Sequence, residues 1–160
     1  MKLTDWMNLA ADAATEIATG ALGMASTRWQ QTPEATLPAD LCGVYIPLMT
    51  DGEAVQLGLL GRREVCAKLA RSLLGMGPDE ELEDESTVFD AVGEVTNMVA
   101  GGVKVRAAAH INVKLGLPLA LSGAPFPLRG EAFEHGLLQM DENDVWLVVA
   151  GATAARAPIA

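Results

Sequence analysis

The chain has 160 residues, of which 50% are hydrophobic and 20% charged, and this suffices for the core of one domain over residues 1–160. Its formal net charge of −10 argues against nucleic acid or an anionic membrane surface as a partner, because both bind a basic face. No apolar run approaches the 18 residues of a membrane span, and acids interrupt the N-terminal segment, so we expect a cytoplasmic protein without a signal peptide.

The first half of the chain is predicted to form two helices and a hairpin. Apolar residues recur at helical spacing over residues 2–19, and Gly20 is a stop signal. The polar segment 26–40 contains two prolines, which indicates a connector or an irregular edge segment. Residues 41–60 comprise two apolar runs around a Thr-Asp-Gly turn, typical of a β-hairpin. A short helix is predicted over 62–75.

The second half is predicted to be one long helix followed by strands. An acidic connector over residues 78–86 leads into a helix at roughly 85–107. Strand candidates follow at 111–123, 131–140 and 144–152. Because hairpins dominate the strand connections, this order predicts an α+β fold, with three helices on one face of a mostly antiparallel sheet of about five or six strands.

Little in the sequence indicates a metal site, a nucleotide site or a disulfide. His110 and His135 are too few for a metal site, since no cysteine or carboxylate is spaced to join them. No glycine-rich nucleotide motif occurs, so no cofactor of the chain's own is expected. Cys42 and Cys66 lie inside apolar runs, which favours buried reduced thiols, although the residues alone leave a disulfide open.

The long helix carries two different faces. One stripe consists of Val88, Val92, Val95, Val99 and Val103. The opposite side, which we call the polar line, consists of Asp90, Glu94, Asn97, Gly101 and Lys104. A stripe of β-branched residues suits packing on a sheet, and its burial must offset the poor helix propensity of this segment. By periodicity alone, the polar line is either a solvated face or a docking face.

Two glycines, one beside the polar line and one within it, favour docking. A solvated helix face is usually filled with good helix formers, and a glycine costs roughly 1 kcal/mol relative to alanine. Gly93 and Gly101 border Glu94 and Asn97, where a missing side chain lets another molecule approach. We therefore predict that the polar line meets a partner.

The segment DAVGEVTNMVAG resembles a family signature. With Asp90, Glu94, Asn97 and Gly101, it is similar to the D/S-x3-E-x2-N-x3-G helix of the CheC/CheX/FliY family of chemotaxis phosphatases. A proline about 21 residues after the asparagine belongs to the same pattern, and Pro118 fits it. The short length and the single clean copy of the signature make CheX the most similar branch.

The resemblance implies a phosphatase for the phospho-aspartate of a CheY-like response regulator, in a CheC-like fold. In such a protein Asn97 would hold the attacking water, and Glu94 would pair with the active-site lysine of the regulator. The regulator would keep its own Mg²⁺, and the phosphatase would need no metal. Asp90, Gly101 and Lys104 are expected contact positions without assigned chemistry, and Asp90 could equally serve only to solvate the helix.

Two other functions stay open. The same face could belong to a non-catalytic module that sequesters or localises a response regulator, or to a component of a flagellar switch, as FliY suggests. The presence of both Glu94 and Asn97 favours the enzyme. The first helix repeats the signature spacing with Asp12, Glu16 and Thr19, either by chance or as a decayed second copy. A threonine is too short to replace the carboxamide, so no catalysis is expected there.

A homodimer joined through sheet edges is also expected. The strand candidates at 135–140 and 145–152 are apolar and lack internal lysine or proline. An unguarded edge strand of this kind tends to pair with another chain. CheX relatives are dimeric, although CheC relatives can be monomers, and a symmetric dimer would leave both polar lines free.

Overall fold

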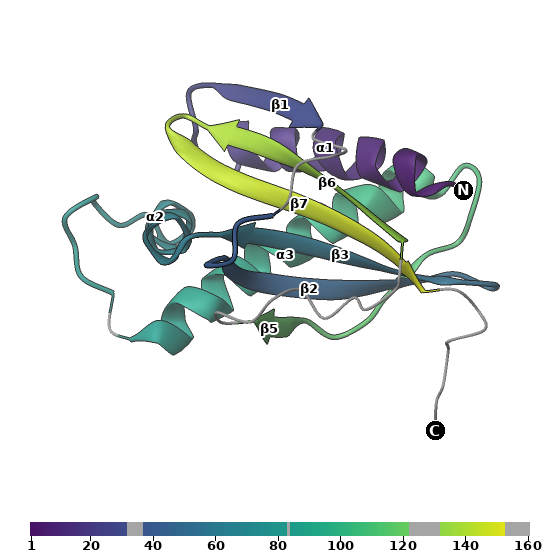
Figure 1. The fold of residues 1–160 in the computed structure, drawn as a ribbon. Helices are drawn as coiled ribbons and strands as arrows, with labels where there is room; N and C mark the ends of the chain where they lie inside the picture. The colour runs from purple at the N-terminus through teal and green to yellow at the C-terminus, as the bar shows by residue number, and fades with distance from the viewer. Residues whose placement is uncertain (32–36, 83, 122–131, 153–160) are drawn as a thin grey trace.

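The computed structural model describes residues 1–31, 37–82, 84–121 and 132–152. These residues form three helices and seven strands (Figure 1). The helices are α1 (Leu3–Thr19), α2 (Arg63–Leu74) and α3 (Glu85–Ala107). The strands are β1 (Thr27–Gln31), β2 (Cys42–Met49), β3 (Ala54–Gly61), β4 (Lys114–Leu115), β5 (Leu119–Leu121), β6 (Ala132–Met140) and β7 (Asn143–Ala152).

The strands form one antiparallel sheet with the helices on one of its faces. The strand order is β1-β6-β7-β3-β2-β4, and β5 pairs with β2 along the same edge as β4. Helices α1 and α3 contact each other across the back of the sheet, and α2 packs on α3 near one end (Figure 1). The predicted α+β fold is confirmed. Within the described ranges, no helix combines the length and apolar character of a membrane span.

Most element boundaries agree with the sequence, and two segments differ. The predicted hairpin is β2–β3, and the long helix spans the residues expected of it. The described part of the strand candidate at 111–123 is instead two short strands, β4 and β5, interrupted at residues 116–118, and residues 122 and 123 lie outside the described ranges. The segment 26–40 contains strand β1, which the sequence did not indicate as a strand. Its residues are mostly polar, and it is ordered by pairing with the distant strand β6.

The two strands on which the expected dimer was based do not lie at a sheet edge. Strand β6 lies between β1 and β7, and β7 lies between β6 and β3. Their apolar, unguarded sequences reflect burial in the middle of the sheet, where both sides of the backbone are already paired. That reasoning was wrong, and the edges of the described sheet are β1 and the β4–β5 side of β2. The homodimer itself stays a prediction.

The valine face of α3 forms the centre of the core between the helices and the sheet. Val92, Val95, Val99 and Val103 are each at most 1% exposed. The one polar side chain among them, Thr96, donates its hydroxyl to the Val92 carbonyl at 2.7 Å, so its burial leaves no unpaired hydroxyl. The predicted orientation of α3 is therefore confirmed on its buried side.

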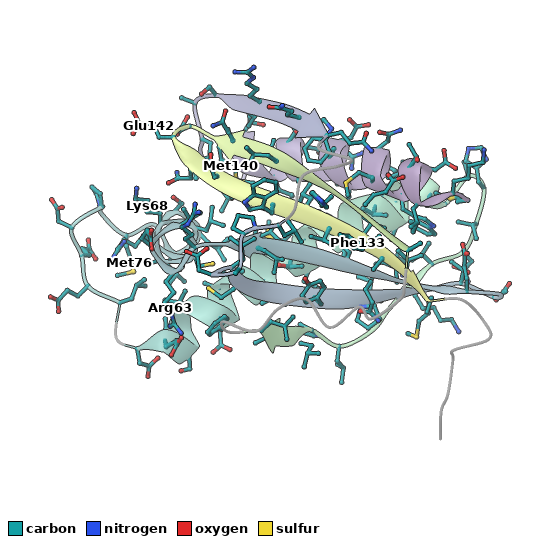
Figure 2. The ribbon with its side chains drawn as sticks, viewed as in Figure 1. Arg63, Lys68, Met76, Phe133, Met140 and Glu142 are labelled. Atoms are coloured by element: carbon teal, nitrogen blue, oxygen red, sulfur yellow. The ribbon has the colours of Figure 1, made fainter. Side chains whose placement is uncertain are left out.

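A smaller hydrophobic cluster, which we call the outer cluster, covers the opposite face of the sheet. It consists of buried Leu41, Tyr45, Leu60 and Val148, with Leu37, Leu121 and Trp146 packed against them. Tyr45 lies directly across from Gly58 in the β2–β3 register, and a Cβ at Gly58 would come within 2.3 Å of the tyrosine ring. The glycine thus makes room for the ring, and the pair fixes the register of the hairpin. On β6, Phe133, which is labelled in Figure 2, stacks on His135 with ring centroids 5.7 Å apart.

The N-terminus of α3 is fixed by a side-chain cap. The carboxylate of Asp84 accepts hydrogen bonds from the Thr87 N–H at 2.9 Å and from the hydroxyls of Ser86 at 2.8 Å and Thr87 at 3.0 Å. These bonds, led by that from the Thr87 N–H, lower the pKa of Asp84. The charged carboxylate also suits the positive end of the helix dipole.

The cap makes the stability contributed by Asp84 dependent on pH. Since its pKa is lower in the folded state, the contribution is fully present above the unfolded carboxyl pKa of about 3.9 and is lost as pH falls through the folded pKa. We expect Asp84→Ala to lower Tm at pH 7, with a smaller difference from wild type below about pH 4. Thermal melts followed by circular dichroism test this. Asp79→Ala removes the same charge from the same connector and should leave Tm nearly unchanged at both pH values. If Asp79→Ala lowered Tm as much as Asp84→Ala does, the capping role of Asp84 would be contradicted.

Candidate functional site

The polar line borders an open groove between α3 and the β4–β5 edge of the sheet. The groove has a volume of about 480 Å³. On α3 it is lined by Phe89, Asp90, Gly93, Glu94 and Asn97. On the sheet side it is lined by Val44, Leu115, Gly116, Leu117, Pro118 and Ala120. The groove thus brings three residues of the polar line together with the proline of the signature, which lies far from them in sequence.

The side chains of Asp90, Glu94 and Asn97 are exposed because the valines hold the opposite face of α3 on the sheet. Gly101 and Lys104 continue the line toward the C-terminus but do not line the groove. Lys104 lies in the last turn of α3, where a cation also suits the helix dipole, so its position has a structural explanation of its own.

The polar side chains in the groove are uncommitted within the described part of the chain. Asp90, Glu94 and Asn97 make no side-chain hydrogen bond or ion pair with any described residue. Neighbouring charges on α3 behave differently, because Glu85 pairs with Arg63 and Arg106 pairs with Glu16. The polar line is therefore available to a partner without breaking any described contact.

Glu94 and Asn97 offer complementary chemistry on one rigid surface. At a separation of three helical residues, their Cβ atoms are roughly 5–6 Å apart. A carboxylate binds a cation, whereas a carboxamide can accept a hydrogen bond from a water molecule and donate others without adding charge. The described residues contain no group of three or more histidine, cysteine or acidic side chains placed to hold a metal ion. The arrangement is suited to positioning a reactant that another molecule brings.

The sequence matches the family described as Chemotaxis phosphatase CheX over residues 44–139, more than half of the chain. The chain belongs to the CheX family. The match spans the groove, including the α3 wall and the segment around Pro118. The predicted membership of the CheC/CheX/FliY group is thereby confirmed. No curated protein matches the sequence.

Solved CheX and CheC-like structures share the fold of this CheX-family chain. CheX from Vibrio vulnificus has a TM-score of 0.73 at 17% identity, and the CheC-like superfamily protein from Shewanella sp. PV-4 has 0.71 at 18%. A chain of the CheX–CheY–BeF3–Mg²⁺ complex from Borrelia burgdorferi has 0.70 at 14%. Each match covers 95% of this chain and 99% of the other. At these identities, the likeness establishes the fold alone.

The repeated spacing in α1 does not form a second groove site. Glu16 is paired with Arg106 of α3, and the Thr19 hydroxyl donates to the carbonyls of Thr15 and Glu16 within its own helix. Asp12 is exposed, but neither of the described cavities includes it. These contacts give Glu16 and Thr19 structural roles in α1, which favours the interpretation of the spacing as chance.

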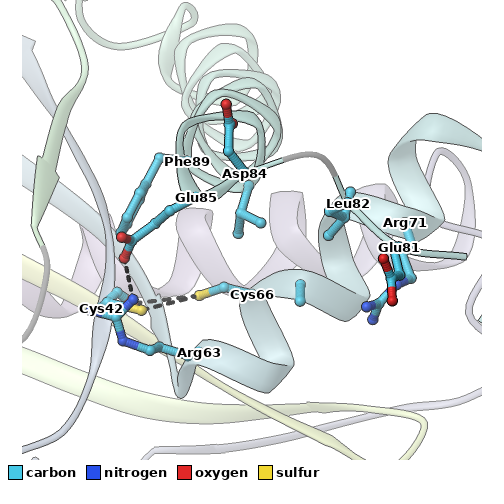
Figure 3. A pocket seen from close by; sticks show the side chains of 11 residues that line it. Cys42, Arg63, Cys66, Arg71, Glu81, Leu82, Asp84, Glu85 and Phe89 are labelled. Carbon is cyan, nitrogen blue, oxygen red and sulfur yellow. Dashed lines mark hydrogen bonds and ion pairs between the residues drawn. The ribbon is translucent and has the colours of Figure 1, made fainter. Parts of the chain in front are cut away.

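A second cavity, of about 410 Å³, lies between α2 and the N-terminal turns of α3 (Figure 3). Both of its arginines are already engaged: Arg63 pairs with Glu85, and Arg71 donates to the Glu80 carbonyl at 2.9 Å. The sulfur atoms of Cys42 and Cys66 are 3.7 Å apart at its base, as two buried free thiols. Burial raises the pKa of Cys66, which keeps that thiol protonated and unreactive near neutral pH.

The sequence did not indicate the apolar wall of the groove. Leu115, Leu117 and Ala120 fall in a segment that we expected to be a continuous strand, in which apolar residues alternate between the faces of a sheet. Only the interruption of that strand brings them to the edge facing α3. The interruption could have been predicted from Gly116 and Pro118, because glycine and proline disfavour an uninterrupted strand.

Two adjacent glycines of α3 have different reasons for being glycine. A Cβ added at Gly102 would lie 2.9 Å from the Cβ of Ala13, so this glycine permits the close packing of α1 on α3. A Cβ added at Gly101 would meet nothing within 4 Å, and one at Gly93 would only touch Val44 at 3.9 Å. Packing inside the described chain therefore explains Gly102 but neither glycine on the exposed side.

We expect Gly101→Ala to raise the free energy of unfolding by about 1 kcal/mol, because it adds helix propensity without a clash. Gly102→Ala gains the same propensity but crowds Ala13, an overpacking cost of about 1–3 kcal/mol. It should therefore be less stable than Gly101→Ala by at least about 1 kcal/mol. Urea denaturation of the two variants measures the difference. A loss of stability in Gly101→Ala would show that the folded chain itself needs this glycine.

Proposed function

We propose that this chain is a phosphatase that accelerates hydrolysis of the phospho-aspartate of a CheY-like receiver protein. The observation that carries the proposal is the Glu94–Asn97 pair, exposed and uncommitted on a rigid helix, in a chain of the CheX family. Further support is that a protein with the same fold from Borrelia burgdorferi forms a complex with CheY. Phosphorylated receivers lie in the cytoplasm, and we propose the same location for this chain.

The proposed reaction is attack of water on an acyl phosphate. The bond between water oxygen and phosphorus forms, the bond from phosphorus to the aspartate oxygen breaks, and the products are inorganic phosphate and the free carboxylate. An acyl phosphate is already reactive, so holding the water in line supplies much of the catalysis. We assign this role to the carboxamide of Asn97, which carries no charge to repel the phosphoryl group.

Glu94 is proposed to dock the receiver. Its carboxylate is exposed and unpaired among the described residues, so it can meet the active-site lysine of a receiver without losing a contact. The receiver would bring its own Mg²⁺ with the phosphorylated aspartate. Asp90, Gly101 and Lys104 are proposed as further contacts along the same helix face, with Gly101 allowing the partner to come close to the α3 backbone.

A non-catalytic receiver-binding module is the second candidate. The uncommitted polar line suits binding as well as it suits catalysis, and a flagellar switch component would use the same face. The two functions differ in the need for Asn97. A binding module requires contact area but no water-holding carboxamide. Acceleration of phosphate release by the wild-type protein would exclude a purely binding role.

We expect Asn97→Ala to reduce acceleration of dephosphorylation by about 100-fold or more, as seen when one group that positions a reactant is removed. Alanine is the better helix former and Asn97 is exposed, so the fold should be retained. Phosphate release from acetyl-phosphate-treated CheY-like receivers of the same organism measures the effect. Asn8→Ala, at an exposed asparagine of α1, is the matched control. Wild-type rates in Asn97→Ala would refute the assigned mechanism.

We expect Glu94→Ala and Glu94→Lys to weaken binding of the phosphorylated receiver by about tenfold or more, since each leaves the receiver lysine unpaired. Binding by the wild type should fall as salt rises, and the variants should show a weaker dependence. Titration calorimetry at two salt concentrations tests both statements, with Asn97→Ala present in every protein so that the receiver keeps its phosphoryl group during the measurement. Glu142→Lys makes the same charge change at the β6–β7 turn, away from α3 (Figure 2), and should bind normally. Equal affinity in all variants would remove Glu94 from docking.

A further inference from the structure

The register of β2 with its two short partners contains a β-bulge beside the groove. Leu48 pairs with Leu115 of β4, and Tyr45 pairs with Leu119 of β5. Between these pairs, residues 46–47 of β2 therefore face three residues, 116–118, of the opposite segment. A bulge of this kind bends the strand and re-aims a side chain, and bulges recur next to functional sites.

Contacts on either side of Leu117 hold the bulge in place. The Gly116 N–H donates to the Pro47 carbonyl at 2.8 Å, and a Cβ at Gly116 would lie 2.8 Å from the proline ring. On the other side, Pro118 has a fixed φ angle. Leu117 is thus carried by a short segment of restricted conformation, which reduces the entropy lost when a partner contacts it.

Leu117 is the most exposed of the large hydrophobic side chains in the described ranges, at 86%. It lines the groove across from the polar line. The two walls of the groove differ in chemistry, because the α3 wall presents the uncommitted carboxylates of Asp90 and Glu94 and the bulge wall is apolar. A molecule that fits both walls must present a cation and an apolar group side by side.

We propose that Leu117 is a docking contact that seats an apolar side chain of the receiver next to its phosphorylated aspartate. The inference rests on the proposed function and identifies a second contact in the same groove. When the lysine of a receiver contacts Glu94, the adjoining surface of the receiver lies against the bulge wall, which consists of Leu115, Gly116, Leu117, Pro118 and Ala120. A second copy of this chain fits the groove less well, since it would cover Glu94 and Asn97 and bring a net charge of −10 toward the carboxylates.

Leu117 does not reach the reacting atoms in this arrangement, so its contact is the same before and during the reaction. Losing it should raise KM and leave kcat unchanged. Leu119 provides a matched control. It is also exposed, at 61%, but its register partner Tyr45 belongs to the outer cluster on the opposite face of the sheet, and Leu119 does not line the groove.

The test compares Leu117→Ser with Leu119→Ser in phosphate release, using each CheY-like receiver of the same organism after acetyl phosphate treatment. We expect Leu117→Ser to raise KM about tenfold with kcat within about twofold of wild type, the effect typical of an apolar contact residue. Leu119→Ser should match wild type, and Leu117→Met should restore most of the affinity because it keeps the apolar volume. Thermal melts confirm that each variant is folded.

Several results would overturn the inference, and they differ from a failure of the proposed function. An active wild type with an unchanged KM in Leu117→Ser removes Leu117 from docking. A fall in kcat at constant KM assigns Leu117 to positioning of α3 instead. Conversion of a wild-type dimer to a monomer by Leu117→Ser, seen in light scattering, makes the bulge an interface between copies. No phosphate release by the wild type from any receiver contradicts the proposed function itself.

Discussion

The exposed chemistry of this protein depends on how firmly the sheet holds the valine face of α3. A helix with six valines and three glycines among its residues has poor intrinsic stability, so its position must come from tertiary burial. Val92, Val95, Val99 and Val103 supply that burial against the sheet. Because the side chains on a helix keep fixed angles around its axis, burial of one face determines which side chains face outward. The orientation of Glu94 and Asn97 is thus a consequence of the core.

The remaining contacts of α3 act at its two ends and leave the middle of its exposed face free. Asp84 caps the first turn, and Arg63 pairs with Glu85 close by. Toward the C-terminus, Gly102 lets α1 approach closely, and Arg106 pairs with Glu16. Between these anchored ends, the described chain leaves the polar side chains of the groove without partners. A surface of this kind is ready to meet another molecule without a prior rearrangement.

The site we propose is small because its substrate brings much of the chemistry. A phospho-aspartate is activated, and a receiver carries its own cation and lysine, so the phosphatase needs only a positioned carboxamide, a docking carboxylate and a shape that admits the right partner. The groove supplies the first two from α3 and the shape from the β-bulge at residues 116–118. In this proposal, catalysis lies on one rigid helix and recognition on both walls of the groove.

The sequence by itself determined the features that follow local rules. The spacing of five valines and of Asp90, Glu94 and Asn97 predicted both faces of α3, because a helix has a fixed period, and the apolar runs around Asp51-Gly52 predicted the β2–β3 hairpin. Only the tertiary structure decided which strands lie at the edges, since β1 is ordered by the distant strand β6 and the apolar strands β6 and β7 are interior. It also decided the groove. Strand β2 pairs with both β4 and β5, and the groove requires that these two pairings differ in register by one residue. Such a register is a relation between distant segments, and no local pattern encodes it.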